Sequence, residues 1–233
     1  MTLSKSIVAL DHSNESQALQ FLEKLDPKLC QIKIGSILFT HYGPNLLEKI
    51  RAKGFKIFLD LKYHDIPQTV AGACTAAAAL GIWMVNIHVS GGMAMMQAAK
   101  QAVQALPIAQ RPLLIGVTIL TSLDDVDLTA IGFAKDAGSM VVHFAKMAHQ
   151  AGLDGVVCSP QEIILLRQNL PKNFILVTPG IRFQDNAAQD QKRIMTPKEA
   201  LLLGADYLVL GRAISQADDP IQVLTAINDN SFF

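Results

Sequence analysis

Short runs of apolar, often β-branched residues alternate with longer helix-like segments along the whole chain, and no linker or low-complexity stretch interrupts them. Runs this apolar are expected to be strands buried on both faces, which requires a parallel sheet covered by helices. The expected strands are residues 6–10, 31–34, 56–61, 82–89, 113–119, 155–158, 174–178 and 207–210. The expected helices are residues 16–25, 36–53, 65–80, 92 to about 106, 121–150 with a break at 136–139, 160–169, 197–203 and a last segment from 211.

Eight strand–helix units in 233 residues predict an α/β fold, a closed (β/α)8 barrel of the TIM type, with residues 1–233 as a single domain. A doubly wound open sheet is the alternative. That fold normally carries a glycine-rich phosphate-binding turn after its first strand, whereas this chain has Asp11-His-Ser-Asn14 there. The barrel is therefore the favoured architecture.

Charge and cysteine usage exclude several classes of protein. Twenty Lys and Arg residues balance twenty Asp and Glu residues, so neither a nucleic acid nor a membrane surface is an expected partner. Cys30, Cys74 and Cys158 lie far apart without metal-ligand spacing, which predicts buried free thiols and no metal site. The chain shows no signal-peptide pattern and no apolar run of membrane-spanning length, so we expect a soluble, cytoplasmic protein.

Three charged residues gather where the third expected strand ends. Asp60, Lys62 and Asp65 follow the apolar run 56–59 within six positions. Because successive side chains of a strand point to opposite faces, Asp60 and Lys62 are expected to share one face. Buried charges need partners, and two acids around one base are typical of a proton-handling site. An ordinary surface ion-pair cluster is the other reading that the spacing allows.

In a barrel of this type the active site lies at the carboxyl ends of the strands. Polar residues stand near most of those ends, and an alternating series of acids and bases would keep Lys62 protonated. Polar strand ends that merely face water are the alternative. His88 is interpreted as a hydrogen-bonded residue of the barrel interior. The polar residues are Asp11, Lys33, Asp60, Lys62, Asn86, His88, Thr121, Ser122, Arg182, Gly211 and Arg212.

The loops after the seventh and eighth strands have the features of a phosphate site. Gly211 allows close approach of backbone amides to an anion, and Arg212 can bind phosphate oxygens in a bidentate way. Arg182 and Gln191 lie on the preceding loop, whose polar composition suggests a mobile lid. A glycine–arginine pair can also simply begin a helix, so its position after the eighth strand carries the argument.

The segment Asp60-Leu-Lys-Tyr-His-Asp-Ile-Pro-Gln-Thr69 resembles the signature of the bacterial orotidine 5′-phosphate decarboxylase family. The resemblance covers essentially the whole chain. Asp-x-Lys-x-x-Asp alone is shared with related phosphate-binding barrels, and the added Ile66-Pro-x-Thr69 makes the match specific. Supporting segments are 8–11, 32–35, 117–122, 177–182, 190–193 and 210–212.

The resemblance implies conversion of orotidine 5′-phosphate to uridine 5′-phosphate and CO₂, the last step of de novo UMP synthesis, without metal or organic cofactor. It implies that Lys62 donates the proton to C6 of the pyrimidine. It also implies that Asp60 and Asp65 are flanking carboxylates and that Lys33 completes the charge network. Asp11 and Lys33 would contact the ribose, and Thr121 or Ser122 the pyrimidine. The implied phosphate contacts come from Arg182, Gln191, Gly211 and Arg212.

The family also forms homodimers with shared active sites, in which Asp65, Ile66 and Thr69 would reach the partner's pocket. Two other functions remain open. One is another enzyme on this scaffold, such as a 3-keto-sugar-phosphate decarboxylase or a pentose-phosphate epimerase, which tend to use a metal. The other is a non-catalytic protein that binds pyrimidine nucleotides.

Overall fold

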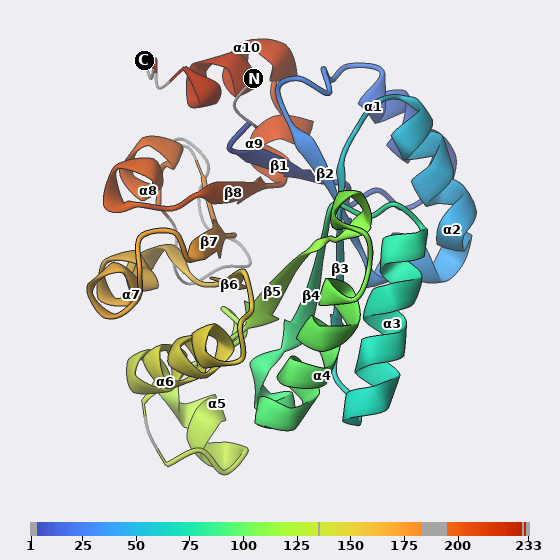
Figure 1. Ribbon diagram of the computed structural model, residues 1–233. Helices are drawn as coiled ribbons and strands as arrows, with labels where there is room; N and C mark the ends of the chain where they lie inside the picture. Colours follow the sequence, from blue (N-terminus) through green and yellow to red (C-terminus); the bar gives the residue numbers. More distant parts are fainter. Residues whose placement is uncertain (1–3, 135, 183–194, 230, 232–233) are drawn as a thin grey trace.

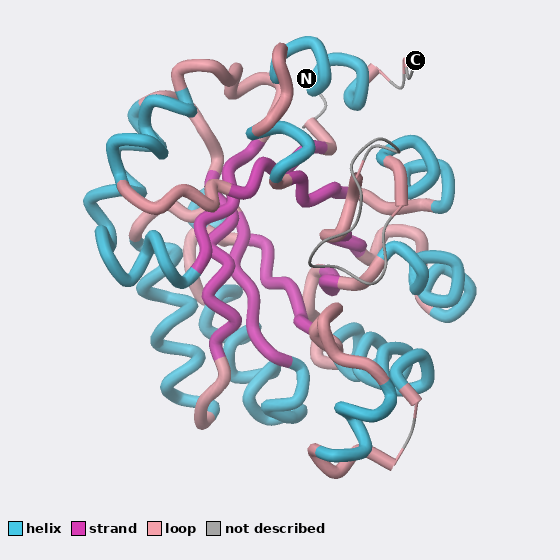
Figure 2. The backbone as a smooth tube through the Cα atoms, turned by 180° about the vertical axis from the view of Figure 1, so that it is seen from behind, coloured by secondary structure: helices cyan, strands magenta, loops and turns pink. Residues whose placement is uncertain are grey.

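The computed structural model describes residues 4–134, 136–182, 195–229 and 231. Its eight strands are parallel and form a closed barrel in the order of the sequence, with β1 paired to β8. This confirms the predicted (β/α)8 barrel, and Figures 1 and 2 show the strands at the centre with helices around them. The strands are β1 (Ser6–Ala9), β2 (Gln31–Gly35), β3 (Ile57–Tyr63), β4 (Met84–His88), β5 (Leu113–Val117), β6 (Gly155–Val157), β7 (Ile175–Thr178) and β8 (Tyr207–Leu210).

The helices follow the strands in the expected alternation. They are α1 (Glu15–Leu22), α2 (Ser36–Ala52), α3 (Pro67–Ala79), α4 (Gly92–Gln104), α5 (Asp125–Ala130), α6 (Ala137–Gln150), α7 (Ile163–Asn169), α8 (Pro197–Leu203), α9 (Arg212–Ser215) and α10 (Pro220–Asn228). Three short 3₁₀ helices, η1 (Val89–Gly91), η2 (Ile108–Gln110) and η3 (Pro160–Glu162), join them. That residues 1–233 form one domain stays a prediction.

Two helical expectations differ from the structure. The helix expected over 36–53 is interrupted at Gly43, whose φ of 54° and ψ of −149° are not helical, directly before Pro44. A residue before proline is driven out of the helical region by its clash with the ring, and glycine accepts the resulting conformation. The segment expected to be helical over 121–150, with a break at 136–139, does contain two helices, but the break comes earlier, since α5 ends at Ala130 and α6 begins at Ala137.

The core has two layers because alternate residues of each strand point inward and outward. The inward-facing residues fill the barrel and include Ile7, Phe58, Met84 and Val209. The outward-facing residues pack against the helices, and Val8 of β1 is one of them. A barrel filled in this way is solid at its centre, so a ligand can enter only at one of its two ends.

Side-chain hydrogen bonds join the last helix, α10, to the residues just before β1 and β2 at the amino-terminal end of the barrel. The Asn228 side chain of α10 accepts the Lys5 backbone N–H at 3.1 Å and donates to the Leu29 carbonyl oxygen at 2.8 Å. The Ser4 hydroxyl lies 2.7 Å from the same Asn228 side chain. These contacts hold α10 against the start of β1, so the last helix stabilises closure of the sheet. None of the helices within the described residues is long and apolar enough to cross a membrane.

Candidate active site

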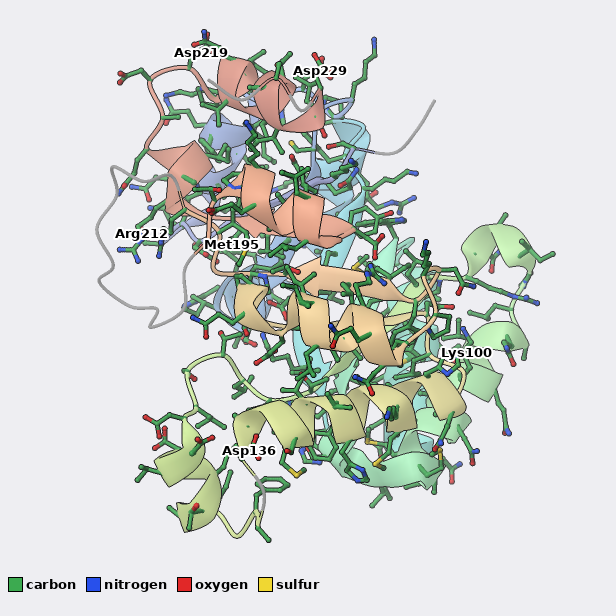
Figure 3. All side chains as sticks on the ribbon, turned by 90° about the vertical axis from the view of Figure 1, so that its left-hand side faces the viewer. Lys100, Asp136, Met195, Arg212, Asp219 and Asp229 are labelled. Carbon is green, nitrogen blue, oxygen red and sulfur yellow. The ribbon has the colours of Figure 1, made fainter. Side chains whose placement is uncertain are left out.

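A cavity of about 570 Å³ opens at the carboxyl ends of the strands. Figure 3 shows Arg212, which lines it, at the same end of the barrel as Asp136, and Lys100 at the opposite end. This volume lies in the range of small-molecule sites. The polar lining contains Asp11, Lys33, Asp60, Lys62, Thr121, Arg182, Gly211 and Arg212. The apolar lining contains Ala9, Phe58, Val117, Ile119, Leu120, Val157, Pro179, Ile181 and Val209.

Four charged residues form an alternating series across the first three strands. Lys33 Nζ lies 3.7 Å from Asp11 Oδ1 and 3.3 Å from Asp60 Oδ2. Lys62 Nζ lies 2.7 Å from Asp60 Oδ1. The side chains of Asp60 and Lys33 are only 12% and 13% exposed, that of Lys62 is 36% exposed, and that of Asp11 is 70% exposed. The series therefore runs from the solvent-exposed rim to a buried carboxylate that is paired on both sides.

The backbone of β3 is irregular where it carries Lys62. Lys62 has a φ of 52°, and among the described residues it is the only residue other than glycine with a positive φ. The pairing of β3 with β4 shifts register between Leu59 and Tyr63. An L-residue in this conformation is strained and has to be held there by its surroundings. Asp60 and Lys62 do meet, as expected, but their contact depends on this irregularity as well as on regular strand alternation.

The Asp60 carboxylate is ionised despite its burial. Burial raises its pKa, but the positive charges of Lys33 and Lys62 and hydrogen bonds from Lys62 and Asn86 outweigh burial, so the pKa lies below its ordinary value. This carboxylate holds the Lys62 Nζ at 2.7 Å. The site can therefore present a fixed cation to a ligand.

His88 shares the inward face of β4 with Met84 and Asn86, as the sequence suggested. Its ring centroid lies 5.4 Å from that of His64, and no hydrogen bond of its imidazole occurs within the described part of the chain. The predicted hydrogen-bonded state is therefore not seen. Burial lowers the pKa of His88, and the nearby His64 and Lys62 lower it further, with Asp60 acting in the opposite direction. We therefore expect a neutral imidazole at neutral pH.

The loops after β7 and β8 form the side of the cavity opposite to Lys62. Arg182, Gly211 and Arg212 all line it. The Arg182 backbone N–H donates to the Met195 carbonyl oxygen at 3.0 Å, and the neighbouring Ile181 forms a parallel bridge with Met195. These contacts fix the loop where Arg182 enters the cavity. Gln191, which was predicted to join this group, lies outside the described residues, as does the loop expected to form a lid.

Four predicted site residues do not line the cavity of their own chain. Asp65, Ile66 and Thr69 are exposed at the start of α3. The Asp65 carboxylate accepts the Ile66 backbone N–H at 2.6 Å, and Ile66 itself is 66% exposed. Ser122 is also exposed and absent from the lining, whereas its neighbour Thr121 belongs to it. Of the two candidates for a base contact, Thr121 is the one at the cavity.

Two features of the site were not assigned from the sequence. One is the role of Asn86, whose side chain contacts both Asp60 and the backbone of Lys62. The other is the apolar wall, including Ile119, Leu120 and Val209. Apolar residues at strand ends carry no signal of their own, because they look the same as core residues. An apolar wall facing charged groups is typical of sites that bind a flat ring together with polar substituents.

The candidate ligands of a metal in the described residues are cysteine, histidine and acidic side chains. Cys30, Cys74 and Cys158 are all buried free thiols, as predicted. No group of three or more His, Cys, Asp or Glu residues with metal-binding geometry occurs within residues 4–134, 136–182, 195–229 and 231.

Comparison with known proteins gives consistent results for sequence and structure. Residues 4–227 match the family model described as "Orotidine 5'-phosphate decarboxylase / HUMPS family". The chain is 54% identical over 224 residues to an orotidine 5′-phosphate decarboxylase of Coxiella burnetii. The aligned region covers 96% of this chain and 95% of the relative. It is 53% identical over 227 residues to that of Nitrosococcus oceani, covering 97% of each. The crystal structure of the Lactobacillus acidophilus orotidine 5′-phosphate decarboxylase superposes with a TM-score of 0.86 at 39% identity, covering 97% of this chain and 98% of that one.

Proposed function

The chain belongs to the orotidine 5′-phosphate decarboxylase / HUMPS family, and on that premise we propose that it converts orotidine 5′-phosphate to uridine 5′-phosphate and CO₂. This would be the last step of de novo UMP synthesis. The names of its relatives support the substrate. The observation that carries the proposal is the position of Lys62, whose ammonium lies 2.7 Å from a buried carboxylate at the wall of the cavity.

The reaction needs a fixed positive charge at one carbon atom. Breaking the bond between C6 and its carboxyl group releases CO₂ and leaves the electron pair on C6, where the ring delocalises it poorly. Two opposite unit charges about 4 Å apart attract by about 4 kcal/mol at an effective dielectric constant of about 20. An ammonium held beside C6 therefore stabilises the developing carbanion by electrostatic preorganisation.

Lys62 then completes the reaction by donating a proton from Nζ to C6. The neutral amine that remains regains a proton from water, and its 36% exposed side chain permits this exchange. Asp60 serves both stages, since its carboxylate pairs with the Lys62 ammonium and holds Nζ in place. Lys33 balances the second oxygen of Asp60 at 3.3 Å, so the carboxylate is held from two sides.

The rest of the cavity suits the remaining parts of the nucleotide. Asp11 and Lys33 would bind the ribose hydroxyls, and Thr121 would contact the pyrimidine along the apolar wall. Arg182 and Arg212 would bind the phosphate, with Gly211 allowing close approach and Gln191 joining from the loop. Phosphate binding far from C6 supplies energy that can organise the reacting end of the substrate.

We also propose that the enzyme is a homodimer that works without a metal or organic cofactor. The exposed Asp65, Ile66 and Thr69 at the start of α3 would enter the partner's site, which accounts for an isoleucine left 66% exposed. Light scattering combined with size-exclusion chromatography measures the dimer. Turnover that is equal with and without a chelator supports a metal-free reaction, and loss of turnover would favour a metal-dependent relative on the same scaffold.

The decisive assay follows the loss of orotate absorbance on mixing the protein with orotidine 5′-phosphate. Lys62→Ala is expected to abolish turnover with the fold retained, as judged by circular dichroism. Lys56→Ala is the matched control, because Lys56 is an exposed lysine just before the same strand. Turnover retained in Lys62→Ala would refute its role as proton donor. Tight binding of uridine 5′-phosphate without any turnover by the wild type would instead indicate a nucleotide-binding protein.

A further inference from the structure

Asn86 of β4 is fully buried and connects the two charged residues of β3. Its Nδ2 donates to Asp60 Oδ1 at 2.7 Å, and its Oδ1 accepts the Lys62 backbone N–H at 2.8 Å. The carboxylate can only accept and the backbone N–H can only donate, so these two partners fix the orientation of the amide. One side chain thus contacts both members of the pair that faces the cavity.

The position of this contact matches the irregular part of β3. The backbone pairing of β3 with β4 is interrupted between Leu59 and Tyr63, and Lys62 adopts its positive φ inside that interval. A strained backbone persists only where the surrounding structure holds it. The Asn86 side chain supplies a hydrogen bond to the strained residue at that point.

An amide suits this place better than other polar groups. Asp60 already has Lys33 and Lys62 as ionic partners, so a neutral donor orients the carboxylate without changing the charge of the series. A carboxylate at position 86 would lack the donor, and a lysine would lack the acceptor. A glutamine offers both groups, but its extra methylene has to fit a site with no exposed surface.

We propose that Asn86 is a positioning residue of the reaction, which holds the Asp60 carboxylate and the left-handed backbone of Lys62 so that the ammonium is directed at C6. This inference rests on the proposed function. It assigns to Asn86 an effect on the rate that acts through Asp60 and Lys62. A purely structural role would instead change only the stability of the fold.

Steady-state kinetics of Asn86→Ala with orotidine 5′-phosphate test the proposal. A misplacement of about 1 Å at a reacting group can lower a rate about 10²-fold, and we expect kcat to fall by about that factor. KM is expected to change little, because the ribose and phosphate contacts lie elsewhere in the cavity. Asn228→Ala is the matched control, since Asn228 also makes several hydrogen bonds, at the opposite end of the barrel. It is expected to lower the melting temperature and leave kcat unchanged.

The pH dependence gives a second readout that a structural role would not move. The charged or titratable groups around Asp60 are Lys33 on β2, Lys62 on β3 and His88 on β4. Loss of the Asn86 hydrogen bond removes one of the contributions that lower the pKa of Asp60. The acidic limb of kcat in Asn86→Ala should therefore shift to higher pH.

If Asn86→Ala does not fold, Asn86→Asp provides a second test of the proposal. Aspartate has nearly the same side-chain volume as asparagine and keeps the acceptor for the Lys62 N–H. At neutral pH it places a second carboxylate beside Asp60 and should lower kcat as well. As the pH falls, one of the two carboxyl groups binds a proton that both can share. We therefore expect the ratio of its kcat to that of the wild type to rise toward acidic pH, and a ratio that stays constant would overturn the positioning role.

A readout that does not need turnover separates this inference from the proposed function. The carboxyl carbon of Asp60 can be titrated by NMR in the wild type and in Asn86→Ala, and its midpoint should rise in the variant. If the wild-type protein shows no turnover, the proposed function is refuted. The titration then still tests whether the Asn86 side chain acts on the Asp60 carboxylate. A kcat within about twofold of the wild type together with an unmoved acidic limb would overturn the positioning role.

Discussion

The positive φ of Lys62 leads to a reversal of the usual ranking of alanine and glycine. Within a strand, glycine is normally less stable than alanine by about 0.5–1 kcal/mol. The left-handed conformation costs an L-residue about 1–2 kcal/mol and costs glycine almost nothing. At position 62, where φ is 52°, we therefore expect Lys62→Gly to be more stable than Lys62→Ala by about 0.5–1 kcal/mol.

The two variants form a clean pair, because both remove the ammonium that neutralises Asp60. The electrostatic loss is the same in each, and the difference between them reports the backbone alone. For a chain of this size, 1 kcal/mol corresponds to about 2–4 °C in melting temperature. Thermal unfolding and urea unfolding provide two independent measurements of the difference in stability between Lys62→Gly and Lys62→Ala.

Leu61 provides the control, since it lies next in the same strand and has no positive φ. There the ordinary ranking should hold, and Leu61→Ala should be more stable than Leu61→Gly by about 0.5–1 kcal/mol. If Lys62→Gly melts at or below the temperature of Lys62→Ala, the backbone at this position is not strained. The argument that the site holds Lys62 in an unfavourable conformation would then fail.

Further substitutions test other parts of the structure. The pKa of Asp60 is depressed in the folded state, so its stabilising effect is present at neutral pH and is lost as the pH falls below about 4. Urea unfolding at a series of pH values should show that the difference in unfolding free energy between wild type and Asp60→Asn shrinks over that range. A difference that stays constant would contradict this expectation. A Cβ at Gly211 would lie 4.0 Å from Asp11 Oδ2, an ordinary contact, so Gly211→Ala should fold normally. The added methyl group should crowd the phosphate and raise KM for orotidine 5′-phosphate. An unchanged KM would show that Gly211 is not part of the phosphate site. A Cβ at Gly155 would clash with the carbonyl oxygen of Ile175 on the neighbouring strand, so calorimetry should show Gly155→Ala destabilised by about 3 kcal/mol. Gly72→Ala, in α3 with open space around it, should gain up to about 1 kcal/mol, and equal effects at both glycines would refute the steric reasoning.

Much of the fold could be predicted because its signals are local. The apolar run 207–210 and the segment 197–203 each carry their own strand or helix pattern, and β8 and α8 have these bounds. The interruption of α2 at Gly43 also had a local signal in the glycine–proline pair, but a continuous apolar periodicity on both sides concealed it.

The site was predictable where it depends on strand ends and not where it depends on cross-strand register. The contact between Asp60 and Lys62 joins residues two positions apart, so the sequence predicts that they lie close together, although the contact itself also depends on the irregular backbone of β3. Asn86 reaches the same carboxylate from 26 positions away, and only the pairing of β3 with β4 shows this. The backbone conformation of Lys62 also has no signal in its residue type. The expected roles of Asp65 and Ile66 depend on a second chain, and remain predictions.

The pairing of β1 with β8 has a consequence for how the protein is made. β1 ends at Ala9 and β8 begins at Tyr207, so β1 lacks one neighbour until β8 has left the ribosome. At about 5–20 residues per second, synthesis of the intervening stretch of roughly 200 residues takes on the order of 10–40 s. During that time the growing half-barrel exposes an unpaired strand edge, which is a template for association with other chains. Nascent chains that stall before Tyr207 should therefore depend on chaperones, and full-length chains should lose that dependence once α10 closes the barrel.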